Sequence, residues 1–223
     1  MKLMLSSLLC GFLALVANDQ NPVPISKESH HHLKLENPYI RIYDVVVPPG
    51  QQTLMHVHAK DYFFVALGDS TLKNQLAGQP DEQDLNLKDG EVHYSPATVI
   101  HRVRNIGKTP FHNLTVELLQ APSRSSEPPA PLGKDQTAVL DNERIRAIHT
   151  VLQPGESTGI HSHPPHTLTI IVRDGSIRVD VPGQKPQDRL VKSGEYVWQD
   201  APLTHSLTNS GKSPVMVVEV EVK

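Results

Sequence analysis

The sequence predicts an all-β protein made of two tandem barrels, and three observations support this fold class. The chain of 223 residues contains an internal repeat of about half its length. Within each copy, short segments alternate between apolar and polar residues with a period of two, the pattern of β-strands. Glycine- and proline-containing turns separate these segments, and no helical periodicity of useful length stands out. A β-barrel of about 90 to 100 residues can bury a core of its own.

The N-terminus has the pattern of a cleavable signal peptide. Met1-Lys2 supplies a positive charge, a mostly apolar stretch runs from Leu3 to Ala17, and polar residues follow. We therefore expect residues 1–17 to be removed and the mature protein to be periplasmic or secreted, with a retained membrane anchor as the alternative. Cleavage would also remove Cys10, the only cysteine, so a metal ion would have to bind nitrogen and oxygen ligands. No later segment is apolar enough to cross a membrane.

The repeat divides the chain into two units. The segment Asn37–Arg41 matches Asn142–Arg146, and the pair His56/His58 matches His161/His163, both at an offset of 105 (142 − 37). Further matches at an offset of 104 (205 − 101) are His101 with His205, and Asn105-x-Gly-Lys-x-Pro110 with Asn209-x-Gly-Lys-x-Pro214. We predict a first domain over 23–120, a proline- and serine-rich linker over 121–134 and a second domain over 135–223.

The strands themselves are predicted from alternation. It is clearest in Asn113–Leu118, Ser176–Val181 and Val217–Val222. Turn sequences such as Lys88-Asp-Gly90 and Lys192-Ser-Gly194 separate such runs.

The histidines predict two metal sites. Residues two apart on a strand point to the same face, so His56 and His58 share a face, as do His161 and His163. A third histidine follows later in each copy, at His101 and His205. Three imidazoles can hold a divalent transition metal and leave positions open for a substrate or water. The sequence does not distinguish Fe, Mn, Zn and Cu, and a degenerate barrel that has lost its metal is the alternative for each site.

These spacings resemble the two sequence motifs of the cupin superfamily. The first motif consists of a glycine, five residues, His-x-His and, after three or four more residues, a glutamate. In the first copy Gly50, His56 and His58 match it, and Tyr62 occupies the glutamate position. In the second copy Gly155, His161 and His163 match it, and Thr167 occupies the glutamate position. The second motif is matched by Gly90, Pro96, His101 and Asn105. In the second copy Gly194, His205 and Asn209 match it more loosely, with Asp200 and Pro202 in place of the motif's proline and middle glycine. The departure is at the glutamate, where Tyr62 and Thr167 stand instead.

The resemblance implies two tandem cupin barrels, that is, double-stranded β-helix or jelly-roll domains. It implies metal ligands at His56, His58 and His101 in the first copy, and at His161, His163 and His205 in the second. Without the glutamate, neutral imidazoles leave the charge of a dication uncompensated, so we expect an anionic small-molecule ligand. Tyr62 shares strand parity with the histidines and is the candidate catalytic residue, although it could equally be a packed aromatic.

Three functions remain open. They are a metal-dependent, dioxygenase-like enzyme acting on a small oxyanion or enolisable substrate, a metal-dependent lyase or isomerase, and a non-catalytic cupin that binds a small molecule or metal. The resemblance also makes a homodimer plausible, although the two copies could satisfy that tendency within one chain. The net charge of −3 and a pI near 6.5 give no electrostatic signature for nucleic acid. The run His30–His32 is interpreted as a flexible polar segment, with a weak metal site as the alternative.

Overall fold

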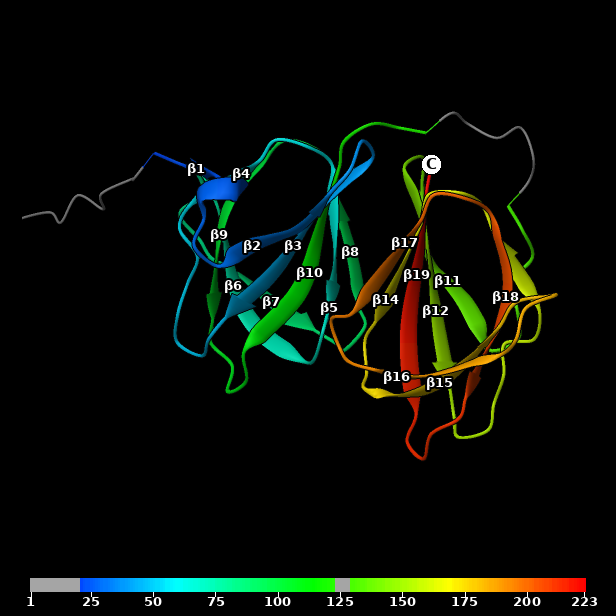
Figure 1. Cartoon of the computed structure of the whole chain (residues 1–223). Coiled ribbons are helices and arrows are strands. Elements are labelled where there is room, and N and C mark those ends of the chain that lie inside the picture. The colour runs from blue at the N-terminus through cyan, green and yellow to red at the C-terminus, as the bar shows by residue number, and fades with distance from the viewer. Residues whose placement is uncertain (1–20, 123–128) are drawn as a thin grey trace, which may run out of the picture.

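The computed structural model describes residues 21–122 and 129–223, so the predicted signal peptide over 1–17 lies outside the described residues. The described chain is almost entirely β-strand and forms two barrels side by side, the first from β1 to β10 and the second from β11 to β19 (Figure 1). This confirms the predicted fold class. Among the described residues, the structure has no helix with the length and apolar character needed to cross a membrane.

The first barrel consists of two five-stranded sheets. One has the order β1-β4-β9-β6-β7 and the other β2-β3-β10-β5-β8. The strands are β1 (Val23–Pro24), β2 (His31–Glu36), β3 (Ile40–Val47), β4 (His56–His58), β5 (Tyr62–Ala66), β6 (Ser70–Leu76), β7 (Gln83–Leu87), β8 (Val92–Ser95), β9 (Val99–Asn105) and β10 (Phe111–Leu118), with a short 3-10 helix η1 (Ile25–Lys27) after β1.

The second barrel repeats this arrangement. Its sheets have the orders β11-β12-β19-β14-β17 and β13-β18-β15-β16. The strands are β11 (Gln136–Asp141), β12 (Ile145–Leu152), β13 (His161–His163), β14 (Thr167–Ile171), β15 (Gly175–Asp180), β16 (Gln187–Val191), β17 (Tyr196–Gln199), β18 (Leu203–Asn209) and β19 (Val215–Val222).

One sheet of each barrel is buried on both faces. On β3, Tyr43, Val45 and Val47 pack inside the first barrel. Ile40 and Ile42 on the same strand belong to a separate core shared with the second barrel. Since side chains alternate along a strand, one sheet contributes to both cores.

The shared core joins the two barrels. It includes Val116 of the first barrel and Val218 and Val220 of the second, all fully buried. Polar contacts surround it: the Arg144 guanidinium lies 2.5 Å from the Asp61 carboxylate, and His149 Nε2 lies 2.6 Å from the Gly90 carbonyl oxygen. The β2-β3-β10-β5-β8 sheet therefore packs on its counterpart in the second barrel.

The connection between the barrels runs from the end of β10 at Leu118 to the start of β11 at Gln136. Residues 123–128 lie outside the described part of the chain. Its final part contacts the second barrel, since Lys134 N donates a hydrogen bond to the Thr158 carbonyl oxygen at 2.7 Å. The domain limits drawn from the sequence stay a prediction.

Candidate metal centres

Strand pairing brings the first predicted triad together. β4 pairs with β9 in antiparallel register, with His56 directly opposite His101. His56 and His58 are both buried, as expected for two residues on the inner face of one strand. The His101 ring centroid lies 4.6 Å from that of His56 and 5.2 Å from that of His58.

The ring nitrogens of this triad suit a shared cation. His56 Nδ1 lies 2.9 Å from the Leu54 carbonyl oxygen, and His101 Nδ1 lies 2.8 Å from the Asn74 side-chain oxygen. Nε2 of His56 is thereby turned inward, 3.1 Å from Nε2 of His58. Nε2 of His101 is buried and has no hydrogen-bond partner among the described residues. Two neutral acceptor nitrogens at this distance fit two ligands of one ion bonded at about 2.1 Å.

A fourth histidine joins this site from β2. His31 offers a ring nitrogen that, with those of His56 and His58, forms a group lying within 4.8 Å, whereas the predicted ligand His101 lies outside this group. Its other nitrogen, Nδ1, lies 2.6 Å from a carboxylate oxygen of Glu28. Interpreting His30–His32 as a flexible polar segment was therefore wrong, because β2 pairs with β3 and places His31 opposite Val45 at the barrel wall.

Glu28 is the buried carboxylate behind this histidine. It accepts hydrogen bonds from the backbone N–H groups of His30 and Leu54, at 2.9 and 3.1 Å. Burial opposes its ionisation, but the hydrogen bonds from His31 and His30 outweigh burial and hold its pKa well below the usual range. An ionised Glu28 fixes the His31 ring with Nδ1 protonated, which leaves Nε2 free as a metal ligand.

The remaining imidazoles of the first site are neutral at physiological pH. Burial lowers the pKa of His56 to about 4, and neighbouring histidines lower it further. Burial also lowers the pKa of His101 to about 3 and depresses that of His58. Neutral imidazole is the form that binds metals, so no proton has to leave these three rings before an ion enters.

A cavity of about 260 Å³ opens onto the first site. It is lined by the four histidines and by Tyr62, Asn74, Asn113 and Thr115 among others. The Tyr62 ring stacks on His58 with a centroid distance of 3.9 Å, and burial raises the pKa of its hydroxyl. The structure thus places Tyr62 beside the ligands in the same cavity, and its catalytic role stays a prediction.

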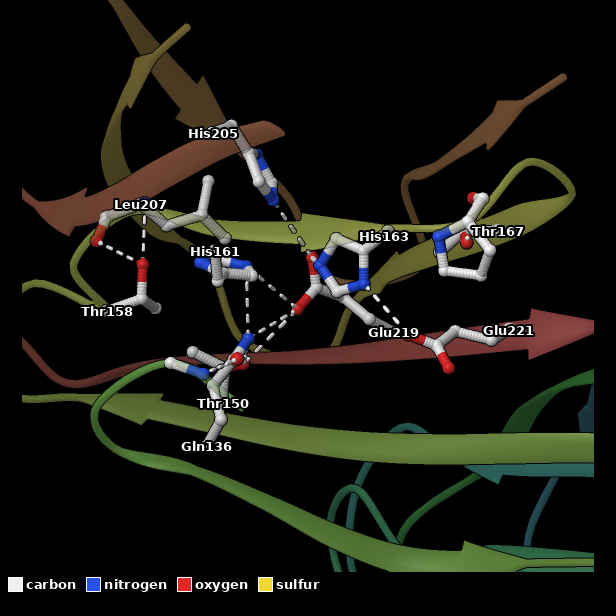
Figure 2. Close-up of polar contacts among 12 residues, drawn as sticks. Gln136, Thr150, Thr158, His161, His163, Thr167, His205, Leu207, Glu219 and Glu221 are labelled. Atoms are coloured by element: carbon white, nitrogen blue, oxygen red, sulfur yellow. Dashed lines mark hydrogen bonds and ion pairs between the residues drawn. The ribbon is translucent and has the colours of Figure 1, made fainter. Parts of the chain in front are cut away.

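The second site contains a carboxylate that the sequence motifs did not indicate. β13 pairs with β18, placing His161 opposite His205, and His163 lies on the same face. Glu219 of β19 points into this group (Figure 2), with one carboxylate oxygen 3.1 Å from His163 Nε2 and 3.5 Å from His205 Nε2. The four residues offer ligand atoms within 4.8 Å of one another, and all four are buried.

Two further residues support the second site. Glu221 lies 3.3 Å from His163 Nδ1 and is also near Arg146, at 3.5 Å. The Gln136 side-chain nitrogen donates to the Glu219 carboxylate at 2.9 Å (Figure 2). Burial opposes protonation of His163, but Glu219 and Glu221 outweigh it and raise its pKa to about 9. Burial likewise opposes ionisation of Glu219, and the His163 and His205 rings hold its pKa below the usual range.

The expected absence of a carboxylate was therefore wrong for the second site. The motif position is Thr167, whose hydroxyl donates to the Pro164 carbonyl oxygen at 2.9 Å and holds the turn. Glu219 comes from the last strand, 52 residues further along the chain (219 − 167). Glu219 lies in the alternating run Val217–Val222, which was visible in the sequence. Such alternation ordinarily means that the polar residues face solvent, whereas both faces of β19 are buried.

The fold and the two histidine sites define a class: two-barrel β proteins with metal-binding groups inside each barrel. The particular family follows from comparison. The cupin domain family matches residues 43–117 and 148–221, once in each barrel, and the chain belongs to this family. A curated relative, the β-alanine degradation protein BauB of Pseudomonas aeruginosa, is 26% identical over 87 residues, covering 39% of this chain and 90% of BauB.

Solved structures share the two-barrel arrangement. AerE from Microcystis aeruginosa aligns over 91% of this chain and 98% of its own, with 12% identity and a TM-score of 0.59. Salicylate 1,2-dioxygenase from Pseudaminobacter salicylatoxidans aligns over 85% of this chain and 75% of its own, with 10% identity and a TM-score of 0.58. At such identities the likeness establishes the fold alone.

Proposed function

We propose that this protein is a metal-dependent, dioxygenase-like cupin enzyme whose first barrel binds a small oxyanion or enolisable substrate. The observation that carries this proposal is the cavity of about 260 Å³ lined by five histidines (His31, His56, His58, His93 and His101) and Tyr62. A cavity with convergent polar groups beside buried ligands is the usual form of a small-molecule site. Its modest volume favours a small substrate.

Charge supports an anionic substrate in the first barrel. The candidate ligands there are imidazoles, and the carboxylate of Glu28 is directed at Nδ1 of His31 and not into the group of ligand atoms. A bound dication would keep most of its charge and attract an oxyanion. In the second barrel, Glu219 lies among the ligands and Glu221 behind His163, so the charge there is largely compensated.

Residues of the cavity can position such a substrate. A bound transition metal supplies Lewis acidity, or redox chemistry if it is iron, manganese or copper. The Tyr62 hydroxyl can donate a hydrogen bond to a substrate oxygen or transfer a proton to it. Thr115 and Asn113 line the same space, and the apolar side chains of Phe64, Leu72 and Val103 on its other walls exclude water.

The second part of the proposal concerns the class of reaction that the first barrel catalyses. The neighbour that supports it is named as a dioxygenase acting on salicylate, a carboxylate substrate. We infer oxygenase chemistry on a small carboxylate or enolate, in the periplasm or outside the cell if residues 1–17 act as a signal peptide. Cell fractionation of the full-length chain would test this location.

The decisive experiment combines metal analysis with turnover. Mature protein purified without a histidine tag is loaded with iron, manganese, zinc or copper and assayed for oxygen consumption with small hydroxy acids and diketones. We expect His56→Ala to lose turnover and one equivalent of metal, whereas His161→Ala loses metal from the second barrel and retains turnover. Loss of turnover only in His161→Ala would reassign the substrate site.

Two other outcomes would change the function itself. Turnover without oxygen uptake would indicate a metal-dependent lyase or isomerase. Tight binding of small carboxylates without turnover under any metal would indicate a non-catalytic binding protein.

A further inference from the structure

The fourth candidate ligand lies on a different, non-corresponding strand in each barrel. On the corresponding strands β2 and β11, His31 pairs opposite Val45 and Gln136 pairs opposite Thr150, positions that correspond at the offset of 105 (136 − 31; 150 − 45). On the last strand, Thr115 and Glu219 correspond at the offset of 104 (219 − 115). The first barrel therefore has a histidine on β2 and a neutral hydroxyl on β10, and the second barrel has an amide on β11 and a carboxylate on β19.

We propose that this exchange makes the two barrels select different metal ions. His31 completes an all-imidazole site that favours zinc or copper, and Glu219 completes a site of three histidines and one carboxylate that also accepts manganese. The inference rests on the proposed function, because it requires that both barrels bind metal.

The contacts of His31 carry the first half of this proposal. Its ring centroid lies 4.8 Å from that of His56, on the inner side of the barrel wall. Its Nδ1 is hydrogen-bonded to a carboxylate oxygen of Glu28 at 2.6 Å. A histidine whose one nitrogen is held by a buried carboxylate and whose ring faces two other histidines has the arrangement of a metal ligand.

The types of donor atom support the second half of this proposal, the difference in metal preference between the two sites. Imidazole nitrogen suits zinc, copper, nickel and iron, whereas carboxylate oxygen suits harder ions such as manganese. In the first barrel Thr115 occupies the position of Glu219, and its hydroxyl donates a hydrogen bond to Asn113 Oδ1 at 2.7 Å. In the second barrel Gln136 cannot take the place of an imidazole, since its amide nitrogen donates to Glu219 and faces His161 Nε2 at 3.2 Å.

Metal titration of the chelator-treated protein tests the inference without an activity assay. Free Mn²⁺ is followed by electron paramagnetic resonance, and Zn²⁺ by competition with a chromophoric chelator. We expect two tight equivalents of Zn²⁺ per chain, but one tight equivalent of Mn²⁺ and a second that binds at least about tenfold more weakly. Equal Mn²⁺ affinity at both sites would overturn the proposal.

Exchange variants locate the two selectivities. His31→Gln should weaken one Zn²⁺ equivalent by at least about tenfold and leave the tight Mn²⁺ equivalent unchanged. His31→Gln with Thr115→Glu should gain a second tight Mn²⁺ equivalent, and Gln136→His with Glu219→Thr should lose the first. The chain already has each introduced residue at the corresponding position, and circular dichroism checks folding. If a double variant does not fold, His31→Gln alone decides.

The outcome separates this inference from the proposed function. Unchanged Zn²⁺ binding in His31→Gln, together with loss of one equivalent in His56→Ala, would refute His31 as a ligand and leave the first metal site intact. Absence of metal binding in both barrels would refute the proposed function and this inference together.

Discussion

At the scale of single residues, the sites depend on which nitrogen of each histidine is already engaged. His56 and His161 place Nδ1 near the backbone carbonyls of Leu54 and Gly159, at 2.9 and 3.1 Å. The same nitrogen is held by side chains in His31 and His101. Each ring is thereby oriented with Nε2 toward its neighbours, which prepares the site before an ion arrives.

Tyr62→Phe tests the predicted catalytic role. If the hydroxyl transfers a proton, turnover should fall by about 10²- to 10⁴-fold while metal content stays unchanged. Steady-state rates and elemental analysis check this, and Thr167→Val at the matching position of the second barrel serves as the control. Unchanged turnover would leave Tyr62 as a packed aromatic on His58.

Glu28→Gln tests the carboxylate behind His31. The amide keeps the shape of the side chain but loses the charge that orients the imidazole, so we expect Zn²⁺ affinity of the first barrel to fall about 10- to 100-fold. Competition titration measures this, and the second barrel within the same chain is the internal control. A loss in both barrels would instead indicate general unfolding.

At the scale of elements, the repeated Asn-x-Gly-Lys-x-Pro motif is explained as a turn. The fully buried Asn105 donates to the carbonyl oxygens of Val47 and Thr109, both at 2.8 Å, and accepts from Gly107 N at 2.9 Å. Asn209 makes the matching three bonds in the second barrel. This asparagine ties the strands that precede and follow the turn to the barrel wall.

Asn105→Ala and Asn209→Ala should each lower the free energy of unfolding by roughly 2 to 4 kcal/mol, because three hydrogen bonds are lost and buried groups stay unpaired. Urea denaturation of the metal-free protein measures the change. Asn86→Ala, at an exposed position of β7, is the control and should stay within about 0.5 kcal/mol of the unmodified protein. A similarly small change in Asn105→Ala would contradict the structural role.

At the scale of the whole molecule, the barrels behave as halves of one folded unit. The largest core cluster contains residues of both barrels, and the Tyr39 ring of the first barrel lies against the His166 ring of the second, tilted by 38° at a centroid distance of 4.0 Å. We expect a single cooperative unfolding transition, because neither sheet can expose its outer face without exposing that core.

The interface should weaken in acid. Burial lowers the pKa of His149, whose Nε2 donates to the Gly90 carbonyl oxygen across the interface. A folded-state pKa below the ordinary 6.5 means that the unfolded chain binds the proton more readily. The stabilisation is therefore complete above about pH 6.5 and is lost as the pH falls below it.

His149→Gln keeps a hydrogen-bond donor but cannot be protonated. Between pH 6.5 and 5, its free energy of unfolding should fall less steeply than that of the unmodified protein. Urea unfolding at several pH values measures both slopes, and pH 8, where neither residue is charged, serves as the reference. Parallel slopes would show that His149 does not contribute.

A homodimer stays a prediction, and light scattering coupled to size exclusion tests it. One face of the β2-β3-β10-β5-β8 sheet is already covered within this chain by the second barrel. Association would therefore have to use another surface. A mass near that of one mature chain would contradict the dimer.

Three features could be predicted from the sequence: the duplication, the barrel class and six candidate ligands, the histidines at 56, 58, 101, 161, 163 and 205. These features are local: a repeat is visible by alignment, and strand parity places residues two apart on one face. The tertiary structure alone decided the fourth members, His31 and Glu219, and the support from Glu28. His31 and Glu219 reach the sites from β2 and β19, and Glu28 follows the short helix η1. The alternation along β19 did not reveal the inward carboxylate, because packing between the barrels buries both faces of this strand.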